Sequence, residues 1–281
     1  MEQYLGALRH ILENGIDRQS RTGISTRAVF GMQLRFNMGD SFPAVTTKKL
    51  PWKSVASELL WFIEGSSDER RLAEILHGTR DASKATIWTA NAEAGYWKPK
   101  AKFQGDLGRI YGVQWRRWKA PDGKEIDQLA NAINMIKENP TSRRIIVTAW
   151  NPGELQEMAL PPCHAFFQFF AANGKLSLQM YQRSCDMFLG IPFNIASYSL
   201  LLHMVSQVTG LKPGELIHTL ADTHIYHNHF EQVKEQLSRK PFPLPKLWLN
   251  PEIKNIDDFT MDDIKLENYQ FHPQIKAEMA V

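Results

Sequence analysis

The dipeptide Asn173-Gly174 constrains the fold of this chain more than any other feature of its sequence. It separates two runs in which apolar and polar residues alternate. Asn-Gly between such runs is the strongest short signal for a β-hairpin, because both residues readily adopt the positive φ angles of a tight turn. A two-residue turn pairs Ala172 with Lys175, and this pairing sets the register of both strands.

The register of this hairpin brings chemically distinctive side chains together. Counting outward from the turn places Cys163 opposite Ser184 and His164 opposite Arg183. Residues that lie opposite each other share one face of a sheet. A β-bulge would shift the pairing by one residue and move Arg183 to the face of the thiol. Either register places Cys163 beside Arg183 and Ser184, with Asp186 just beyond them.

Cys163 is therefore a candidate nucleophile. A cysteine reacts as its thiolate, and nearby cations lower the pKa of a thiol. Pro161-Pro162 also restricts the backbone just before it. The alternative is a buried structural cysteine, since free cysteines are among the most buried residue types. Cys185, the other cysteine, fits that role better, and two cysteines favour a reducing, cytoplasmic compartment over a disulfide-bonded one.

Helical and alternating patterns together predict the fold class. The expected helices are 2–14, 52–64, 124–138, 194–209 and 228–239. The expected strands are 27–36, 144–150, 163–171, 175–183 and 215–226. This mixture indicates an α+β (mixed α/β) fold with a large mixed, mainly antiparallel sheet flanked by helices. No linker or repeat divides the chain, so we expect one domain over 1–281 with a partly helical insertion or surface loop at about 74–104.

The charge pattern limits the classes of ligand. Lys plus Arg number 33 and Asp plus Glu number 30, giving a net charge of +3 without long runs of one sign, so nucleic acid is not expected as the main partner. The apolar runs are too short to span a membrane. The doublets Arg116-Arg117 and Arg143-Arg144 suit a small phosphorylated ligand better than a polyanion, the alternative being surface solubility. His227 and His229 lack a third ligand, so no metal site is expected.

Three further positions carry polar groups where the pattern is otherwise apolar or strand-like. Glu58 interrupts an apolar helix face, and a buried Glu is rare unless it is paired or functional, although a salt bridge would also explain it. His224 and Tyr226 share one face of a strand and suit hydroxyl groups, or are simply half-buried. Asn194 begins the apolar helix, where we expect it as the N-cap.

Segments from end to end of the chain resemble the folate-dependent thymidylate synthases. The most specific are LPPCHAFFQFF (160–170) and YQRSCDMFLGIPFNIASY (181–198). The others are RTG (21–23), FPAVTTKKL (42–50), SELLWFIEG (57–65), DLGRIYGVQWRRW (106–118), SRRIIVTAWNP (142–152), DTHIYHNH (222–229) and IKAEMAV (275–281). The resemblance implies a mixed α/β homodimer, packed through its sheet, that methylates dUMP. The co-substrate would be 5,10-methylenetetrahydrofolate, acting as one-carbon donor and reductant, with no metal or flavin.

The resemblance also implies roles for single residues. Cys163 would add to C6 of uracil, which makes C5 able to attack the folate methylene group. Asn194 would distinguish uracil from cytosine by accepting from N3–H and donating to O4. Protons would be handled by Glu58, Tyr111 and His164. The phosphate would be bound by Arg21, Arg183 and Ser184 of one subunit and by Arg143 and Arg144 of its partner. The sugar 3′-OH would be bound by His224 and Tyr226.

For the folate, the resemblance implies an apolar wall next to the nucleotide. The wall would contain Ile87, Trp88, Leu189, Gly190 and Phe193. Asp186 would contact the pterin as well as border the nucleotide, Lys48 would lie near the glutamate tail, and Ala280 with Val281 would close over the ligand. The chain departs from many relatives at Thr89 and Asn91, where an Asp and a second Trp are common, and at Leu220-Ala221, where Gly-Gly is common.

Two other functions are alternatives. Pyrimidine hydroxymethylases resemble the same family, and in them water captures the exocyclic methylene in place of hydride. Asn194 argues against cytosine, which leaves a dUMP hydroxymethylase producing 5-hydroxymethyl-dUMP and tetrahydrofolate. A non-catalytic nucleotide- or RNA-binding protein on this fold would be expected to lack Cys163, Asn194 or the arginines, and all are present.

Overall fold

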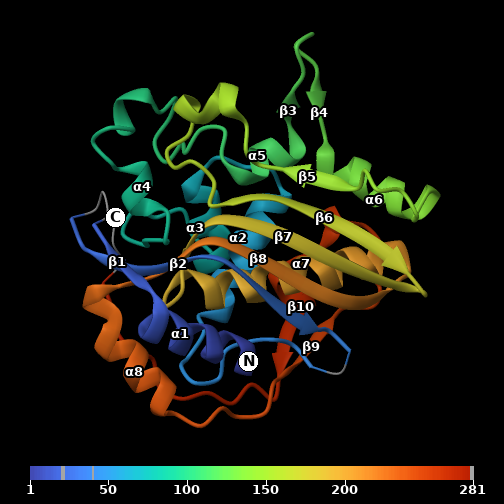
Figure 1. Ribbon diagram of the computed structural model, residues 1–281. Coiled ribbons are helices and arrows are strands. Elements are labelled where there is room, and N and C mark those ends of the chain that lie inside the picture. The colour runs from blue at the N-terminus through green and yellow to red at the C-terminus, as the bar shows by residue number, and fades with distance from the viewer. Residues whose placement is uncertain (20–22, 40, 279–281) are drawn as a thin grey trace.

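The computed structural model describes residues 1–19, 23–39 and 41–278. A six-stranded sheet forms its centre, in the order β1-β2-β8-β7-β6-β5 (Figure 1). Neighbouring strands of this sheet are antiparallel apart from β7 and β8, which run parallel and are joined by the long helix α7. The single-domain α+β fold with a mainly antiparallel sheet is therefore confirmed.

The strands follow the predicted segments and add three regions that were not predicted. The strands of the main sheet are β1 (Ile16–Arg18), β2 (Thr26–Asn37), β5 (Ile146–Thr148), β6 (His164–Ala172), β7 (Lys175–Asp186) and β8 (Lys212–Tyr226). Two further pairs are β3 (Trp118–Lys119) with β4 (Glu125–Ile126), and β9 (Lys246–Leu249) with β10 (Ile264–Glu267). The short β1 and these two pairs had no alternating pattern long enough to reveal them.

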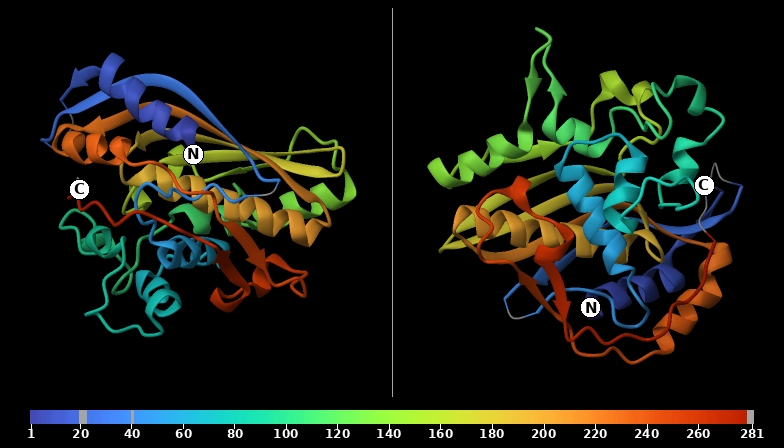
Figure 2. Two further views of the ribbon diagram at one scale, coloured as in Figure 1. Left: turned by 90° about the horizontal axis from the view of Figure 1, so that it is seen from below. Right: turned by 180° about the vertical axis from the view of Figure 1, so that it is seen from behind.

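The helices pack mainly on one face of the sheet. The α-helices are α1 (Glu2–Asn14), α2 (Trp52–Ile63), α3 (Glu69–His77), α4 (Thr89–Ala92), α5 (Tyr111–Arg116), α6 (Gln128–Glu138), α7 (Gly190–Thr209) and α8 (Phe230–Ser238). The 3-10 turns are η1 (Lys98–Lys100), η2 (Pro152–Glu157), η3 (His227–His229), η4 (Ile256–Asp258) and η5 (Met261–Asp263). In the view from behind in Figure 2, α2 and α7 lie in front of the sheet, and α7 contacts both β7 and β8. Among the described helices, none is long and apolar enough to cross a membrane.

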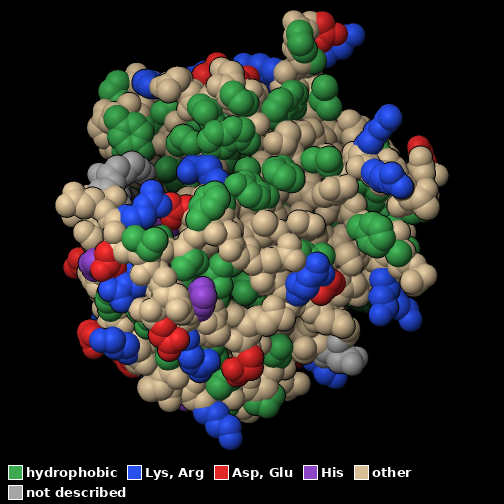
Figure 3. Space-filling view, in the orientation of Figure 1, with side chains coloured by type: hydrophobic (Ala, Val, Ile, Leu, Met, Phe, Trp, Pro, Cys, Tyr) green, Lys and Arg blue, Asp and Glu red, His purple; other side chains and the backbone are tan. Residues whose placement is uncertain are grey.

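The other face of the sheet carries exposed apolar side chains. Phe30 is 84% exposed and Phe170 is 66% exposed. The ring of Phe166 stacks on Tyr181 with the centroids 5.6 Å apart. Figure 1 looks onto this face, and the space-filling view of Figure 3 shows hydrophobic side chains among its polar groups. Monomeric proteins rarely expose large apolar patches, so this face is a candidate interface.

The apolar helix α7 is buried along nearly its whole length, as its composition predicts. The prediction of its start is wrong. The helix begins at Gly190, and Asn194 lies inside it and not at its N-cap. Pro192 falls in the first turn, where its missing N–H removes no intrahelical hydrogen bond, so the helix extends through it.

The predicted start of the helix over 124–138 is also wrong. Helix α6 begins at Gln128, because the Asp127 side chain accepts a hydrogen bond from the backbone N–H of Ala130 and caps the first turn. Residues 125–126 instead pair with residues 118–119 in a hairpin that projects from the molecule (Figure 1). Ile126 is 40% exposed.

The β6–β7 hairpin has the predicted turn and contains the bulge considered above. Asn173 and Gly174 have φ angles of 51° and 70°. The ladder keeps the expected register from the turn to Phe166 and then shifts by one residue, so that His164 pairs with Gln182. Ala165 is thus the extra residue. The shift turns Cys163 to the face of Arg183, whose backbone N–H donates to the Cys163 carbonyl over 2.9 Å.

The insertion at about 74–104 is partly helical, since it contains the end of α3, α4 and η1. It is not merely a surface loop. Trp88 is 6% exposed and Trp97 is 3% exposed, so both indoles belong to the core. Trp97 Nε1 donates to the carbonyl of Asp106 over 2.7 Å, which fixes the insertion to the following segment.

Candidate functional site

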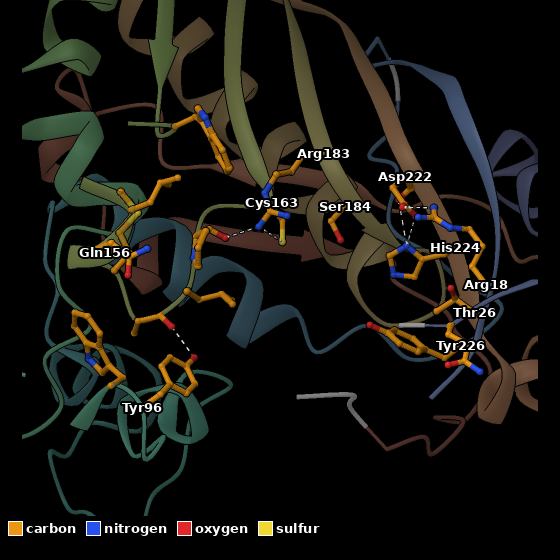
Figure 4. A pocket seen from close by; sticks show the side chains of 18 of the residues that line it. Arg18, Thr26, Tyr96, Gln156, Cys163, Arg183, Ser184, Asp222, His224 and Tyr226 are labelled. Atoms are coloured by element: carbon orange, nitrogen blue, oxygen red, sulfur yellow. Dashed lines mark hydrogen bonds and ion pairs between the residues drawn. The ribbon is translucent and has the colours of Figure 1, made fainter. Parts of the chain in front are cut away.

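A cavity of about 700 Å³ opens where β6, β7 and β8 meet the insertion and η2 (Figure 4). Its lining includes Cys163, just before β6, and the strand residues Arg18, Thr26, Arg183, Ser184, Asp222, His224 and Tyr226. The insertion contributes Tyr96, Trp97 and Lys100, and the segment around η2 contributes Leu155 and Gln156. The cavity therefore brings together the predicted nucleophile, Cys163, two of the predicted phosphate ligands, Arg183 and Ser184, and the predicted sugar ligands.

A fixed cation lies beside the thiol. Nη2 of Arg183 is 4.0 Å from Sγ of Cys163. Its Nε donates to the carbonyl of Pro162 and its Nη2 to that of Pro161, each over 2.8 Å. The guanidinium also stacks over Trp150, 5.3 Å from the ring centroid. A positive charge held this close favours a thiolate over a thiol.

Two Asp222 contacts that sequence reasoning did not predict orient the imidazole of His224. Nδ1 of His224 lies 3.1 Å from Oδ1 of Asp222, and Oδ2 of Asp222 accepts from Arg18 over 2.8 Å. The hydrogen bond from His224 holds the pKa of Asp222 below its usual range, with Arg18 adding to this effect. An ionised Asp222 accepts a hydrogen bond from Nδ1–H of His224, which leaves Nε2 of the ring for a ligand in the cavity. Asp222 lies two residues before His224 and so on the same strand face, and this spacing is the sequence signal that could have revealed the contact.

Glu58 lies buried behind this cavity, at 4% exposure, as its place on the apolar face of α2 indicates. Its Oε1 accepts from the indole Nε1 of Trp88 over 2.7 Å. Burial raises the pKa of Glu58 to about 7, although the Trp88 hydrogen bond favours the ionised form. A carboxyl group with this pKa can give or take a proton near neutral pH. Tyr111 is close to Glu58, and its hydroxyl accepts from the backbone N–H of Cys163 over 2.7 Å.

His164 and Asn194 lie together on the buried side of the hairpin. Burial lowers the pKa of His164 to about 3, against an interaction with the Asn194 side chain, so the ring is neutral at physiological pH. Oδ1 of Asn194 accepts from Nε2 of Gln182 over 3.1 Å. Oε1 of Gln182 in turn lies 2.9 Å from Nε2 of His218. This chain of groups, which sequence reasoning did not predict beyond Asn194, fixes which end of the Asn194 amide is the acceptor.

The second cysteine has the structural role expected of it. Cys185 is fully buried, and burial raises the pKa of its thiol to about 12. Cys163 and Cys185 do not form disulfide bonds. Of the two, Cys163 is the one that lies beside a cation, so it remains the candidate nucleophile.

The predicted phosphate ligands are only partly brought together. Arg183 and Ser184 line the cavity. Arg143 and Arg144 do not line it and are exposed on the segment before β5. Arg21 lies outside the described residues.

The other notable arginines have structural partners. Arg116 pairs with Asp127 at 2.9 Å, and Arg117 donates to the carbonyl of Gly65. Arg27 pairs with Asp17 at 2.8 Å. The doublet at 116–117 therefore connects α5 to its neighbours and does not border the cavity.

Of the predicted folate residues, Asp186, Leu189, Gly190 and Phe193 lie at the start of α7 or just before it, and none of the described ones lines the cavity. Asp186 Oδ1 accepts from the backbone N–H groups of Phe188 and Leu189, over 3.0 and 3.2 Å, so it orders the first turn that contains Gly190 and Phe193. Ile87 is 43% exposed, whereas Trp88 is committed to Glu58. Ala280 and Val281 lie outside the described residues.

Lys48 is buried, unlike an exposed ligand for a charged tail. Its Nζ donates to the carbonyl of Phe188 and lies 3.6 Å from the centroid of the Phe188 ring. Burial lowers the pKa of Lys48 to about 7, while the nearby Asp186 favours the charged form. In this structure Lys48 supports the loop before α7.

The family model described as thymidylate synthase matches residues 2–281, which is essentially the whole chain.

Proposed function

The chain belongs to the thymidylate synthase family, a family of methyltransferases, and on this premise we propose that it converts dUMP to dTMP. The proposed one-carbon donor and reductant is 5,10-methylenetetrahydrofolate, which leaves as dihydrofolate. The observation that carries the proposal is the pairing of Cys163 with the fixed guanidinium of Arg183 in a cavity bordered by Ser184, His224 and Tyr226.

The proposed role of Cys163 is covalent. Its thiolate adds to C6 of the uracil ring, which makes C5 nucleophilic, and its later elimination releases the product. The proposed part of Arg183 is to stabilise the thiolate form for the attack, since its guanidinium lies 4.0 Å from the sulfur. The bond between the Tyr111 hydroxyl and the backbone N–H of Cys163 holds the nucleophile in place.

Asn194 is proposed to recognise the base. Its Oδ1 accepts from Gln182, and a carbonyl oxygen has a second lone pair for uracil N3–H. Its Nδ2 then donates to O4. Cytosine presents the opposite pattern at these positions, so an amide fixed in this orientation disfavours it. The sugar 3′-OH is proposed to bind the Nε2 acceptor of His224 and the hydroxyl of Tyr226.

Glu58 is proposed to handle protons at the pyrimidine. Its buried carboxyl group titrates near neutral pH. His164 stays neutral, so it contributes hydrogen bonding and not a positive charge. With Tyr111, whose ring lies 4.9 Å from that of His164, these groups form a proton-handling cluster beside the nucleophile.

The residues near the start of α7 fit a reduced folate. Such a ligand has a flat polar pterin, an apolar middle and an anionic tail. In the described residues, both hydrogen bonds at Asp186 use Oδ1, so Oδ2 is available for pterin N–H groups. The exposed Ile87 provides apolar surface. When bound, the folate supplies the one-carbon unit and the hydride.

A homodimer is proposed to complete the phosphate site. The described cations on the cavity lining are Arg18, Lys100 and Arg183, and Arg18 is already paired with Asp222. A phosphate dianion calls for further positive charge, which Arg143 and Arg144 of a second copy would supply. The exposed apolar face around Phe30 and Phe170 is the proposed contact between the copies. Two cysteines that form no disulfide bond fit a reducing compartment such as the cytoplasm.

Product analysis tests the reaction. The protein is incubated with dUMP and 5,10-methylenetetrahydrofolate, the nucleotide is identified by mass spectrometry and the folate by absorbance. The proposal expects dTMP and dihydrofolate in equal amounts. Formation of 5-hydroxymethyl-dUMP with tetrahydrofolate would instead support the hydroxymethylase alternative. Binding of dUMP without any product would indicate a non-catalytic protein.

A further inference from the structure

A buried ion pair lies at the base of the insertion, outside the cavity. Glu69 is 2% exposed and Arg70 is 8% exposed. Nε and Nη2 of Arg70 donate to the two carboxylate oxygens of Glu69 over 2.6 and 2.5 Å. Burial alone would raise the pKa of Glu69, but hydrogen bonds from Arg70, Thr89 and Thr86 outweigh it and hold the pKa below its usual range. Glu69 is therefore a buried anion at neutral pH.

The same carboxylate binds two hydroxyl groups that flank Trp88 in the sequence. Oε1 of Glu69 accepts from Oγ1 of Thr86 over 2.7 Å and from Oγ1 of Thr89 over 2.6 Å. Each hydroxyl also accepts from the backbone. The N–H of Trp88 donates to Thr86 Oγ1 over 3.1 Å, and the N–H of Thr86 donates to Thr89 Oγ1 over 2.8 Å. One carboxylate oxygen thus fixes the backbone on both sides of the tryptophan.

Arg70 extends this network to the loop that leads into Thr86. Its Nη1 donates to the carbonyl of Asp81 over 2.8 Å, and Nη1 and Nη2 each donate to the carbonyl of Lys84 over 3.2 Å. Arginine suits this task because its planar fork presents several donors in fixed directions. The pair therefore holds the insertion from about Asp81 to Thr89 against α3.

The far end of this network is Glu58. The indole of Trp88 donates to its carboxylate and packs against Phe62 and Tyr111, with centroids 6.5 and 5.8 Å from the Trp88 ring. We propose that Glu69 and Arg70 act as positioning residues which, through the hydroxyls of Thr86 and Thr89, hold the Trp88 indole in hydrogen-bonding contact with Glu58. This deepens the proposed function, in which Glu58 handles protons.

The expected consequence concerns the ionisation of Glu58. A hydrogen bond to a carboxylate favours its charged form, so loss of the Trp88 contact would raise the pKa of Glu58 further above 7. Among the described residues, the titratable groups that act on Glu58 from the neighbouring helices are Tyr111 of α5 and Tyr198 of α7. Burial raises the pKa of each well above its usual range, so neither changes charge in the range that matters.

The test measures the pKa of Glu58 by carbon-13 NMR of labelled glutamate carboxyl groups, with the Glu58 signal assigned by its absence in Glu58→Gln. In Glu69→Gln, one of the two acceptor oxygens becomes an NH₂ group, which cannot accept from the donors that face it. Thr89→Val removes one hydroxyl without changing the size of the side chain. Both are expected to raise the pKa of Glu58 by about one unit, as in Trp88→Phe, which removes the donor itself. Thr89→Ser keeps the hydroxyl and is expected to match the unchanged protein.

Glu154→Gln is the matched control. It breaks another buried ion pair, that of Glu154 with Arg109 at 2.5 Å, which does not contact Trp88. It is expected to lower stability without moving the pKa of Glu58. An unchanged pKa in Thr89→Val, or in a folded Glu69→Gln, would overturn the positioning role. The NMR measurement needs no substrate, so absence of dTMP formation would count against the proposed function and not against this inference.

Discussion

Nη2 of Arg183 lies 4.0 Å from Sγ of Cys163 and is held there by the carbonyls of the two prolines that precede the cysteine. The guanidinium group, which comes from β7, is therefore fixed to the segment that leads into β6. The Pro161-Pro162 pair supplies both of these acceptors. Proline has no backbone N–H but retains its carbonyl, and both carbonyls accept from the guanidinium.

Replacing this cation should make the thiol less reactive. Arg183→Met is expected to slow alkylation of Cys163 by iodoacetamide at pH 7 by about tenfold, because the thiolate loses its nearest positive charge. Peptide mass spectrometry after timed labelling measures the rate. Cys185, which is fully buried, serves as the internal control and should stay unlabelled in the folded protein. Equal rates for Cys163 in both proteins would contradict the role of the arginine.

Asn194→Asp should weaken discrimination against cytosine. A carboxyl group can retain the Gln182 contact but no longer presents the fixed amide donor for O4. The ratio of kcat/KM for dUMP to that for dCMP is expected to fall by about tenfold or more. Steady-state kinetics with both nucleotides measures the ratio. Unchanged rejection of dCMP would show that another group recognises the base.

Glu58→Gln should change how stability depends on pH. The pKa of Glu58 is about 7 in the folded protein and near 4.5 when unfolded, so the folded state binds the proton more tightly. The stability contributed by this proton is complete below pH 4.5 and is lost as pH rises through 7. The glutamine variant lacks this loss. Its free energy of unfolding relative to the unchanged protein is expected to rise by about 3 kcal/mol between pH 4.5 and pH 8.

Urea denaturation at a series of pH values measures this difference. Glu154→Gln is the control, because the pKa of Glu154 is lowered by its hydrogen bonds to Arg109 and Gln114 in spite of burial. Its stability relative to the unchanged protein should be constant from pH 5.5 to pH 8. A parallel pH dependence of the two variants would show that Glu58 is not the group that titrates near 7.

Mixed dimers should reveal whether the arginines act across an interface. Cys163→Ala is expected to abolish turnover while leaving dUMP binding largely intact, and Arg143→Ala to raise the KM for dUMP. A mixture of the two variants, unfolded and refolded together, should recover activity, because one of its two sites keeps both residues. The refolded mixture is compared with each variant refolded alone. Activity no greater than the sum of the two would place Arg143 outside the partner's site.

Local patterns predicted the elements that surround the site. The Asn173-Gly174 turn predicted the hairpin. Two registers were considered for its strands, one regular and one with a bulge, and the bulged one is present. The continuous apolar pattern of α7 identified its burial. These signals succeed because each depends on a few adjacent residues and on one buried face.

The wrong predictions of helix starts concern positions where two local structures compete. Asn194 and Asp127 are both good N-cap residues, but an N-cap residue must itself lie outside the helix. Asp127 does, whereas Pro192 allowed α7 to begin before Asn194. Gln182 and Glu69 were not predicted as functional, because their partners are distant in the sequence or belong to a segment with little periodicity. Thr89 was noticed only as a departure from relatives, and the structure explains it as a ligand of Glu69.

Because of the bulge at Ala165, the number of residues in this strand decides which way the Cys163 side chain faces. Removing Ala165 would leave Cys163 opposite Arg183 in a regular ladder, because the flanking pairs Phe166 with Tyr181 and His164 with Gln182 become consecutive. Adding one residue there would require a second irregularity or would turn the thiol toward the core. The segment between nucleophile and turn should therefore tolerate a deletion at this point and resist an insertion.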